Sequence, residues 1–123
     1  MAKTKSPQRE DRIHTEIVVD AHGSEEVAMS WYYYLEQVIK FPVTTTCRAR
    51  RATSPLKKGD EVEITALADM DDCEHEIFVM TRWDTKDYLA VPLAQLTPIP
   101  STDEATTDAI EDWHYWVNQG YEF

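Results

Sequence analysis

The spacing of the apolar residues changes at Pro42, and this change constrains the fold more than any other feature of the sequence. Before Pro42, Val27, Trp31 and Leu35 recur at helical spacing, which predicts an amphipathic helix over residues 24–41 with Ser24 as its N-cap. Proline cannot continue a helix and pushes the preceding residue toward extended geometry. The helix is therefore expected to end here and strands to follow.

After Pro42, apolar and polar residues alternate, as is typical of half-buried strands. Strands are predicted over residues 43–51, 62–68, 76–83 and 88–92, and residues 93–99 are expected to form a helical turn and a last short strand. Short antiparallel strands with tight connections favour a small, strongly bent barrel, and we expect the SH3-like form.

A second helix is predicted over residues 102–118, with Ile110 and Trp113 on its apolar stripe and Gly120 as its stop. Residues 14–23, with an apolar centre at residues 17–19, fit a short strand or a helical turn equally well. The expected fold is α+β and mainly β: an SH3-like antiparallel barrel between an N-terminal and a C-terminal helix. Residues 1–12 are polar and are predicted to be a flexible tail, and residues 13–123 a single domain.

The formal charge of −11 is distributed unevenly. Residues 1–58 carry ten Lys/Arg against seven Asp/Glu, a net of +3, whereas residues 59–123 carry two against sixteen, a net of −14. Such a field draws cations and disfavours nucleic acid as a partner of the acidic part. No apolar stretch is long enough for a membrane span, and the N-terminus lacks an apolar signal core, so a soluble cytoplasmic monomer with reduced Cys47 and Cys73 is expected.

The acidic charge is densest between the second and third predicted strands. Five acids fall within eight residues there: Asp69, Asp71, Asp72, Glu74 and Glu76. Side chains two residues apart on an extended chain lie about 6.5–7 Å apart, and opposed residues of a hairpin about 4.5–5.5 Å apart. One calcium ion, which takes oxygen ligands, bridges such separations and removes the like-charge repulsion. A solvated acidic turn that only aids solubility is the alternative, and the pattern leaves both open.

This segment is not an EF-hand, because that loop requires Gly at its sixth position and counting from Asp69 places Glu74 there. An open, partly hydrated site of micromolar or weaker affinity is therefore expected.

Further carboxylates form two weaker candidates. Glu104, Asp108 and Asp112 fall at i, i+4 and i+8 of the second helix, although a solvated helix face explains this spacing better. Asp84 and Asp87 lie in a tight turn that antiparallel connectivity places at the opposite end of the barrel.

Other chemistries have less support. Cys47, Cys73 and His75 do not show the spacing of a zinc site, and no nucleophile, phosphate loop or acid–base pair predicts an enzyme. The basic run 48–58 is the main rival, because it fits an SH3-like interaction module that binds a peptide or nucleic acid. Neutralisation of the acidic turns by this run is the simpler interpretation.

Several unusual strings, WYYYLE, SPLKKGD and DWHYWV, stand in an order that resembles the cyanobacterial calcium-binding CcbP family over about residues 13–123. The resemblance implies an SH3-like barrel with flanking helices that sequesters Ca²⁺ without EF-hands, through surface carboxylates at more than one site. It also implies a place in intracellular calcium signalling. The resulting hypothesis is a monomeric calcium buffer that passes a signal to a protein partner.

Overall fold

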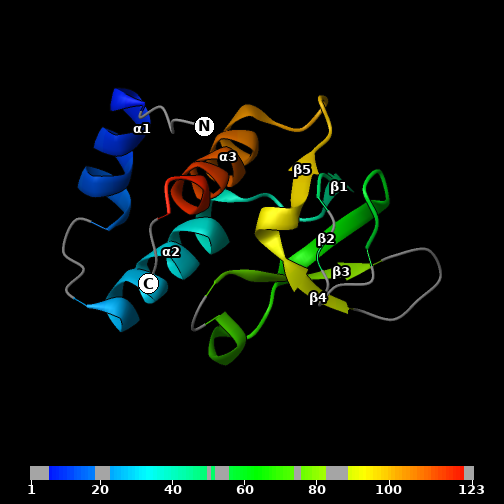
Figure 1. Ribbon diagram of the computed structural model, residues 1–123, viewed down its shortest axis with the longest axis horizontal. Helices are drawn as coiled ribbons and strands as arrows, with labels where there is room; N and C mark the ends of the chain where they lie inside the picture. The colour runs from blue at the N-terminus through cyan, green and yellow to red at the C-terminus, as the bar shows by residue number, and fades with distance from the viewer. Residues whose placement is uncertain are drawn as a thin grey trace.

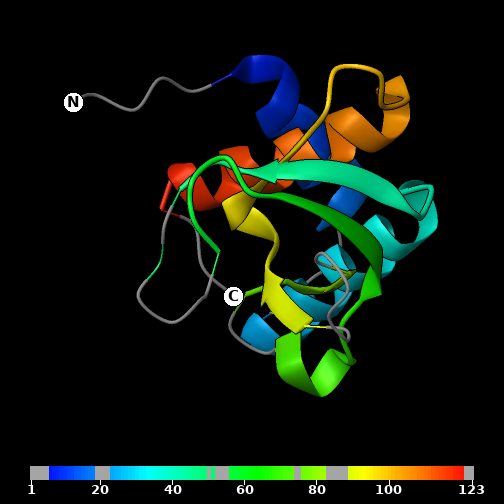
Figure 2. The ribbon, with the colours of Figure 1, turned by 90° about the vertical axis from the view of Figure 1, so that its right-hand side faces the viewer.

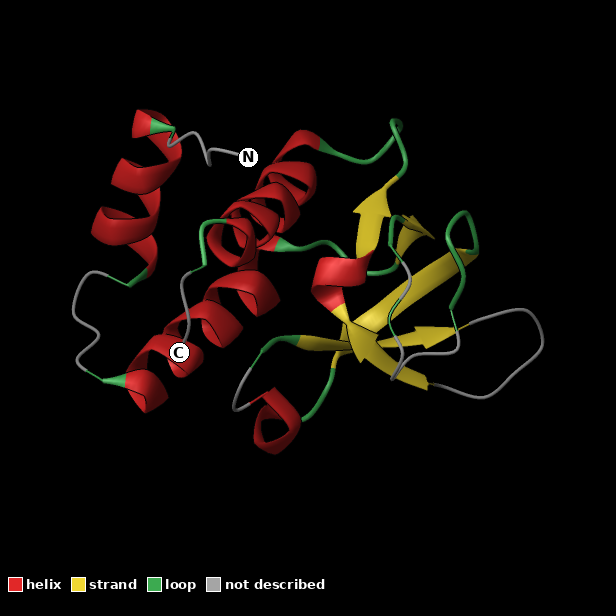
Figure 3. Cartoon of the chain, in the orientation of Figure 1, coloured by secondary structure: helices red, strands yellow, loops and turns green. Residues whose placement is uncertain are grey.

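The computed structural model describes residues 6–18, 23–49, 51, 56–73, 76–82 and 89–120, without the side chains of residues 24, 72 and 89. Three helical elements come first, five strands with two short helical turns among them follow, and a last helix ends the described chain (Figures 1 and 3). In chain order they are α1 (Pro7–Arg12), the π-helix η1 (Ile13–Ile17), α2 (Ser24–Val38), β1 (Val43–Cys47), β2 (Glu61–Leu67), the 3-10 helix η2 (Met70–Cys73), β3 (Phe78–Arg82), β4 (Leu89–Pro92), the 3-10 helix η3 (Leu93–Gln95), β5 (Leu96–Pro98) and α3 (Glu104–Asn118).

The strands form one antiparallel sheet in the order β4-β3-β2-β1-β5. In a flat sheet, strands β4 and β5 would lie about 19 Å apart at opposite edges, yet only four Cα steps, at most about 14 Å, join Pro92 to Leu96 through η3. The sheet must therefore curve strongly. Within the described residues its edge strands do not pair, so the predicted closed barrel is not confirmed, and the fold is α+β.

Both predicted helices are present with slightly different ends. Helix α2 begins at Ser24, but its N-cap is Gly23, whose φ of 95° suits glycine better than any other residue. The expected cap is thus one residue too late. In helix α3 the Asp103 side chain is the N-cap and accepts a hydrogen bond from the Thr106 amide at 3.0 Å. This hydrogen bond from the Thr106 backbone, followed by one from the Thr106 side chain, lowers the pKa of Asp103.

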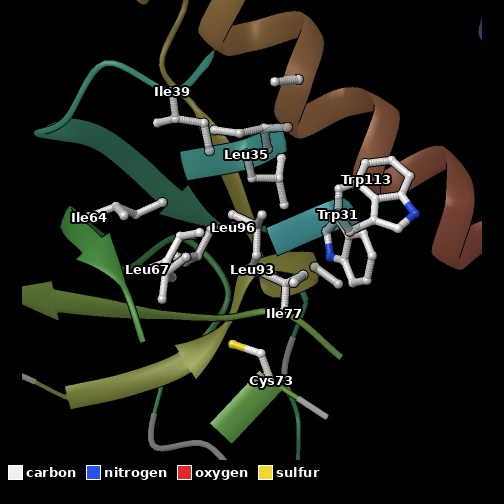
Figure 4. Close-up of a cluster of buried hydrophobic side chains, with 14 of the residues drawn as sticks. Trp31, Leu35, Ile39, Ile64, Leu67, Cys73, Ile77, Leu93, Leu96 and Trp113 are labelled. Atoms are coloured by element: carbon white, nitrogen blue, oxygen red, sulfur yellow. The ribbon is translucent and has the colours of Figure 1, made fainter. Parts of the chain in front are cut away.

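The core lies between the curved sheet and helices α2 and α3, which run side by side (Figures 1, 2 and 4). Trp31 is fully buried, and its ring centroid lies 5.1 Å from that of Trp113 and 5.5 Å from that of Trp116. Leu35 and Leu96 fill the layer between this aromatic cluster and the sheet (Figure 4). The aromatic run at residues 31–35 thus packs the core through its helical face.

The N-terminal segment differs from the expected flexible tail. Residues 7–12 form α1, whose N-cap Ser6 accepts a hydrogen bond from the Arg9 amide, and the chain continues into the π-helix η1. Ile13 and Ile17 of η1 are buried in the core. The segment is ordered because its charged residues find partners on α3, about a hundred residues along the chain.

Two further findings bear on the expectations. Cys47 and Cys73 are both buried, and no disulfide bond joins these two described residues. Among the described residues, no helix has the length and apolar character needed to cross a membrane.

Candidate metal centre

The acidic turn, defined here as residues 69–76, connects β2 to β3 and contains η2 (Figure 3). Its Asp69 and Asp71 side chains are exposed to solvent. The Asp72 side chain and residues 74–75 lie outside the described part. The predicted cluster is thus represented by Asp69, which precedes η2, Asp71, which lies within it, and Glu76, which follows it.

Three contacts fix the acidic turn to the core. The Tyr32 hydroxyl donates a hydrogen bond to the Ala68 carbonyl at 2.7 Å, and the Ala68 amide donates one to the Phe78 carbonyl at 3.0 Å. Cys73 is buried, and its sulfur accepts a hydrogen bond from the Phe78 amide at 3.4 Å. Figure 4 shows Cys73 at the edge of the apolar cluster, beneath Ile77. Asp69 and Asp71 are therefore attached to backbone that is anchored on both sides.

Glu76 is already engaged by a cation from the basic run. Its Oε1 lies 2.7 Å from the Arg51 guanidinium, and both side chains are partly exposed. Arg48 points its Nε to the Ala94 carbonyl at 2.7 Å, and burial, followed by repulsion from Arg51, lowers its pKa. Both arginines of the rival interaction surface are thus engaged within the protein, and the pairing of Arg51 with Glu76 supports internal neutralisation.

One carboxylate near the acidic turn was not predicted from the sequence. The pKa of Tyr32 is raised by burial first, and then by the charges of Glu36, Cys73 and Asp69. Glu36 of α2 is exposed and lies close enough to Tyr32 to act on it, as Asp69 does. In the sequence, Glu36 stands four residues after Tyr32 and so lies on the same side of the helix. This spacing could have identified Glu36 as a neighbour of the acidic turn.

The carboxylates of α3 do not form one solvated stripe. Glu104 is exposed, Asp108 is half-buried, and Asp112 is fully buried. Arg12 donates from Nε to Asp112 Oδ2 at 2.8 Å and from NH2 to Oδ1 at 2.7 Å, and Arg9 also pairs with Asp112. The structure therefore separates Asp112 from Glu104 and places it inside a contact with α1.

Asp84 and Asp87 lie outside the described residues, so the third candidate stays a prediction. Within the described part of the chain, no three His, Cys, Asp or Glu side chains are arranged to hold a metal ion. Among the described residues of the acidic turn, Asp69 and Asp71 expose carboxylate oxygens, which fit a hard cation such as Ca²⁺. The Cys73 sulfur faces backbone groups and is not available to a softer metal.

Comparison with known proteins agrees with this chemistry. Residues 11–117 match the family model of CcbP, described as calcium binding. The fold superimposes with a TM-score of 0.86 on the crystal structure of Anabaena CcbP, at 35% identity and with 100% of each chain covered. It also superimposes with a TM-score of 0.86 on a calcium-binding protein in the calcium-binding form, at 32% identity, covering 100% of this chain and 99% of the other. No curated protein sequence matches the chain.

The chain belongs to the CcbP family of calcium-binding proteins. The ion that the resemblance implied, Ca²⁺, is therefore confirmed.

Proposed function

We propose that the protein sequesters and buffers Ca²⁺ in the cytoplasm, and that the acidic turn is its principal site. The ligands in this proposal are Asp69, Asp71, Asp72, Glu74 and Glu76. The observation that carries it is the anchoring of exposed carboxylates by the Tyr32, Ala68 and Cys73 contacts. A turn held in this way loses little conformational freedom when an ion binds.

The affinity follows from the exposure of the turn. Asp69 and Asp71 face water, so a bound Ca²⁺ keeps part of its hydration shell, and an affinity in the micromolar range or weaker is expected. Such a site suits a buffer that exchanges the ion readily. Magnesium binds more weakly, because it gives up its water reluctantly and requires a tighter octahedron.

Glu76 gives the acidic turn an internal counter-ion. Its ion pair with Arg51 lowers the repulsion between the carboxylates while the ion is absent. An exposed pair of this kind contributes less than about 1 kcal/mol, so a divalent cation displaces the guanidinium at small cost.

Calcium signalling through a protein partner belongs to the same proposal. So do two secondary calcium sites, one at Asp84 with Asp87 and one at the α3 carboxylates. An interaction module built on residues 48–58 is disfavoured, because Arg48 and Arg51 are used within the protein.

Calorimetric titration with Ca²⁺ in moderate salt tests the proposal. Asp69→Asn combined with Asp71→Asn is expected to weaken binding at least tenfold, because two of the proposed oxygen ligands lose their charge. Glu61→Gln with Glu63→Gln removes the same charge from β2 and serves as the control, with a change of less than about threefold from screened long-range attraction. Equal weakening by both pairs would mean diffuse attraction of cations and would contradict a site at the turn.

A further inference from the structure

Two large apolar side chains are exposed on the outer face of α2. Met29 is 36% and Tyr33 51% accessible to solvent, and within the part of the chain that the structure describes no other large hydrophobic residue is exposed to this degree. Their spacing of four residues places them on one side of the helix, away from the buried Trp31 and Leu35. Single exposed apolar residues are common, but two that share a helix face form a patch.

The Tyr33 side chain is held in place from beneath. Its ring meets that of Tyr32 edge-on, with the ring centroids 6.1 Å apart and the planes at 89°. Tyr32 is buried, and its hydroxyl donates a hydrogen bond to the Ala68 carbonyl at 2.7 Å, just before the acidic turn. Helix α2 also contacts η2 of that turn (Figure 1). An anchor that is fixed in this way loses little conformational freedom when a partner covers it.

Carboxylates flank the apolar patch at both ends. Glu25 stands four residues before Met29, and Glu36 three residues after Tyr33, and both acids are exposed. At about 100° per residue, these four side chains fall within an arc of about 80° on the helix surface. The face is about 17 Å long, or about three helical turns, at about 1.5 Å per residue. It therefore has an apolar centre and an acidic rim.

The rim carboxylates have no cation of the protein's own among the described residues. Neither Glu25 nor Glu36 takes part in the ion pairs of the described chain, in which other acids pair with arginine or histidine. Lys40 follows Glu36 by four residues, but it lies beyond the end of α2 and acts on Asp103 before α3. The negative charge of the rim is thus available to the cations of a partner.

We propose that this face of α2 docks a basic, amphipathic helix of a partner protein. The apolar side of that helix covers Met29 and Tyr33, and its Lys or Arg side chains pair with Glu25 and Glu36. Tyrosine and methionine are enriched at the centre of protein interfaces, and complementary charge selects the partner. Nucleic acid and anionic lipid surfaces are disfavoured, because the rim repels them. The inference does not depend on calcium binding.

Peptide binding in the presence of EDTA, followed by fluorescence anisotropy, tests the docking face. The probe is a labelled peptide of about 14 residues that contains only leucine and lysine, with the leucines at helical spacing. A matched peptide carries glutamine in place of every leucine, so it keeps the charge and the helix propensity. The leucine peptide is expected to bind the wild type at least about tenfold more tightly, because only its side chains bury the apolar patch.

Met29→Gln combined with Tyr33→Gln removes the apolar centre and keeps the charge. The variant is expected to bind the leucine peptide at least about tenfold more weakly than the wild type does, and the glutamine peptide within about twofold. Both side chains are exposed, so the fold is retained, which circular dichroism checks. A folded variant that binds the leucine peptide as tightly as the wild type would overturn the docking face, as would equal binding of the two peptides by the wild type.

The rim is tested by Glu25→Gln combined with Glu36→Gln, which is expected to weaken the leucine peptide at least about fivefold. Glu61→Gln with Glu63→Gln removes the same charge from β2 and is the control, with a change below about twofold from screened long-range attraction. Equal weakening by the two pairs would mean diffuse attraction of a basic peptide to an acidic protein and would also overturn the proposal.

Discussion

Replacing Asp112 with alanine is expected to lower the free energy of unfolding by about 3 kcal/mol or more. The carboxylate is fully buried and holds Arg9 and Arg12, so its removal leaves Arg12 without its hydrogen-bonded counter-charge and Arg9 with Glu111 alone. Breaking a buried ion pair from one side typically costs about 3–5 kcal/mol, and the partial exposure of both arginines places this case at the low end. Urea denaturation followed by circular dichroism measures the change.

Glu111→Ala is the matched control, since Glu111 pairs with the same Arg9 from the neighbouring position but is about half exposed. Its expected cost is below about 1 kcal/mol, as for other surface pairs. Similar losses for the two variants would show that the buried position of Asp112 does not matter, and the account of α1 as a segment tied to α3 would fail.

Acidification is expected to destabilise the protein through His114. Burial is the main reason that the pKa of His114 falls from 6.5 to about 4, and the Arg48 charge adds to this, while the carbonyls of Leu93 and Leu96 oppose it. The folded state therefore resists protonation that the unfolded state accepts. The stabilisation is complete above pH 6.5 and is lost as the pH falls to about 4, by a total of about 3 kcal/mol.

The comparison of His114→Gln with His14→Gln isolates this contribution. His14 is half exposed on η1, so His14→Gln should keep the wild-type decline in stability between pH 6.5 and 4. His114→Gln should flatten the decline, whatever its effect on stability at pH 7. Parallel declines for His114→Gln and the wild type in thermal melts would show that His114 does not carry the loss.

The elements that the sequence predicts well are those in which apolar side chains recur at a regular spacing. Trp31 and Leu35 in α2, and Ile110 and Trp113 in α3, lie on the faces that helical spacing assigns to the core. The strands follow from alternation in the same way, as the buried and half-buried positions of Val43–Cys47 show. A single period suffices in each case, because one face of the element is buried.

Closure of the sheet could not be predicted in this way. Alternation identifies strands but does not say whether the outer two strands pair, since pairing depends on how far the sheet curves. The three residues of η3 force strong curvature, but β4 and β5 remain separate edges.

Long-range partners could not be predicted at the N-terminus or on α3. Composition alone predicts a flexible tail over residues 1–12, whereas residues 7–12 form α1, since Arg9 and Arg12 reveal nothing about a carboxylate a hundred residues away. The spacing of Glu104, Asp108 and Asp112 likewise gives the face of the helix but not what covers it. In the acidic turn the sequence indicated the charges, while the burial of Cys73 that anchors them became apparent only from the structure.

Calcium titration followed by amide NMR shifts is the most direct test of the central claim, that an anchored acidic turn binds the ion. The account predicts saturable shifts that are largest at residues 69–76, appear at lower calcium concentration than any shift in α3, and are not reproduced by magnesium at equal ionic strength. Small, unsaturated shifts spread over all acidic surfaces, or the same shifts with magnesium, would contradict it.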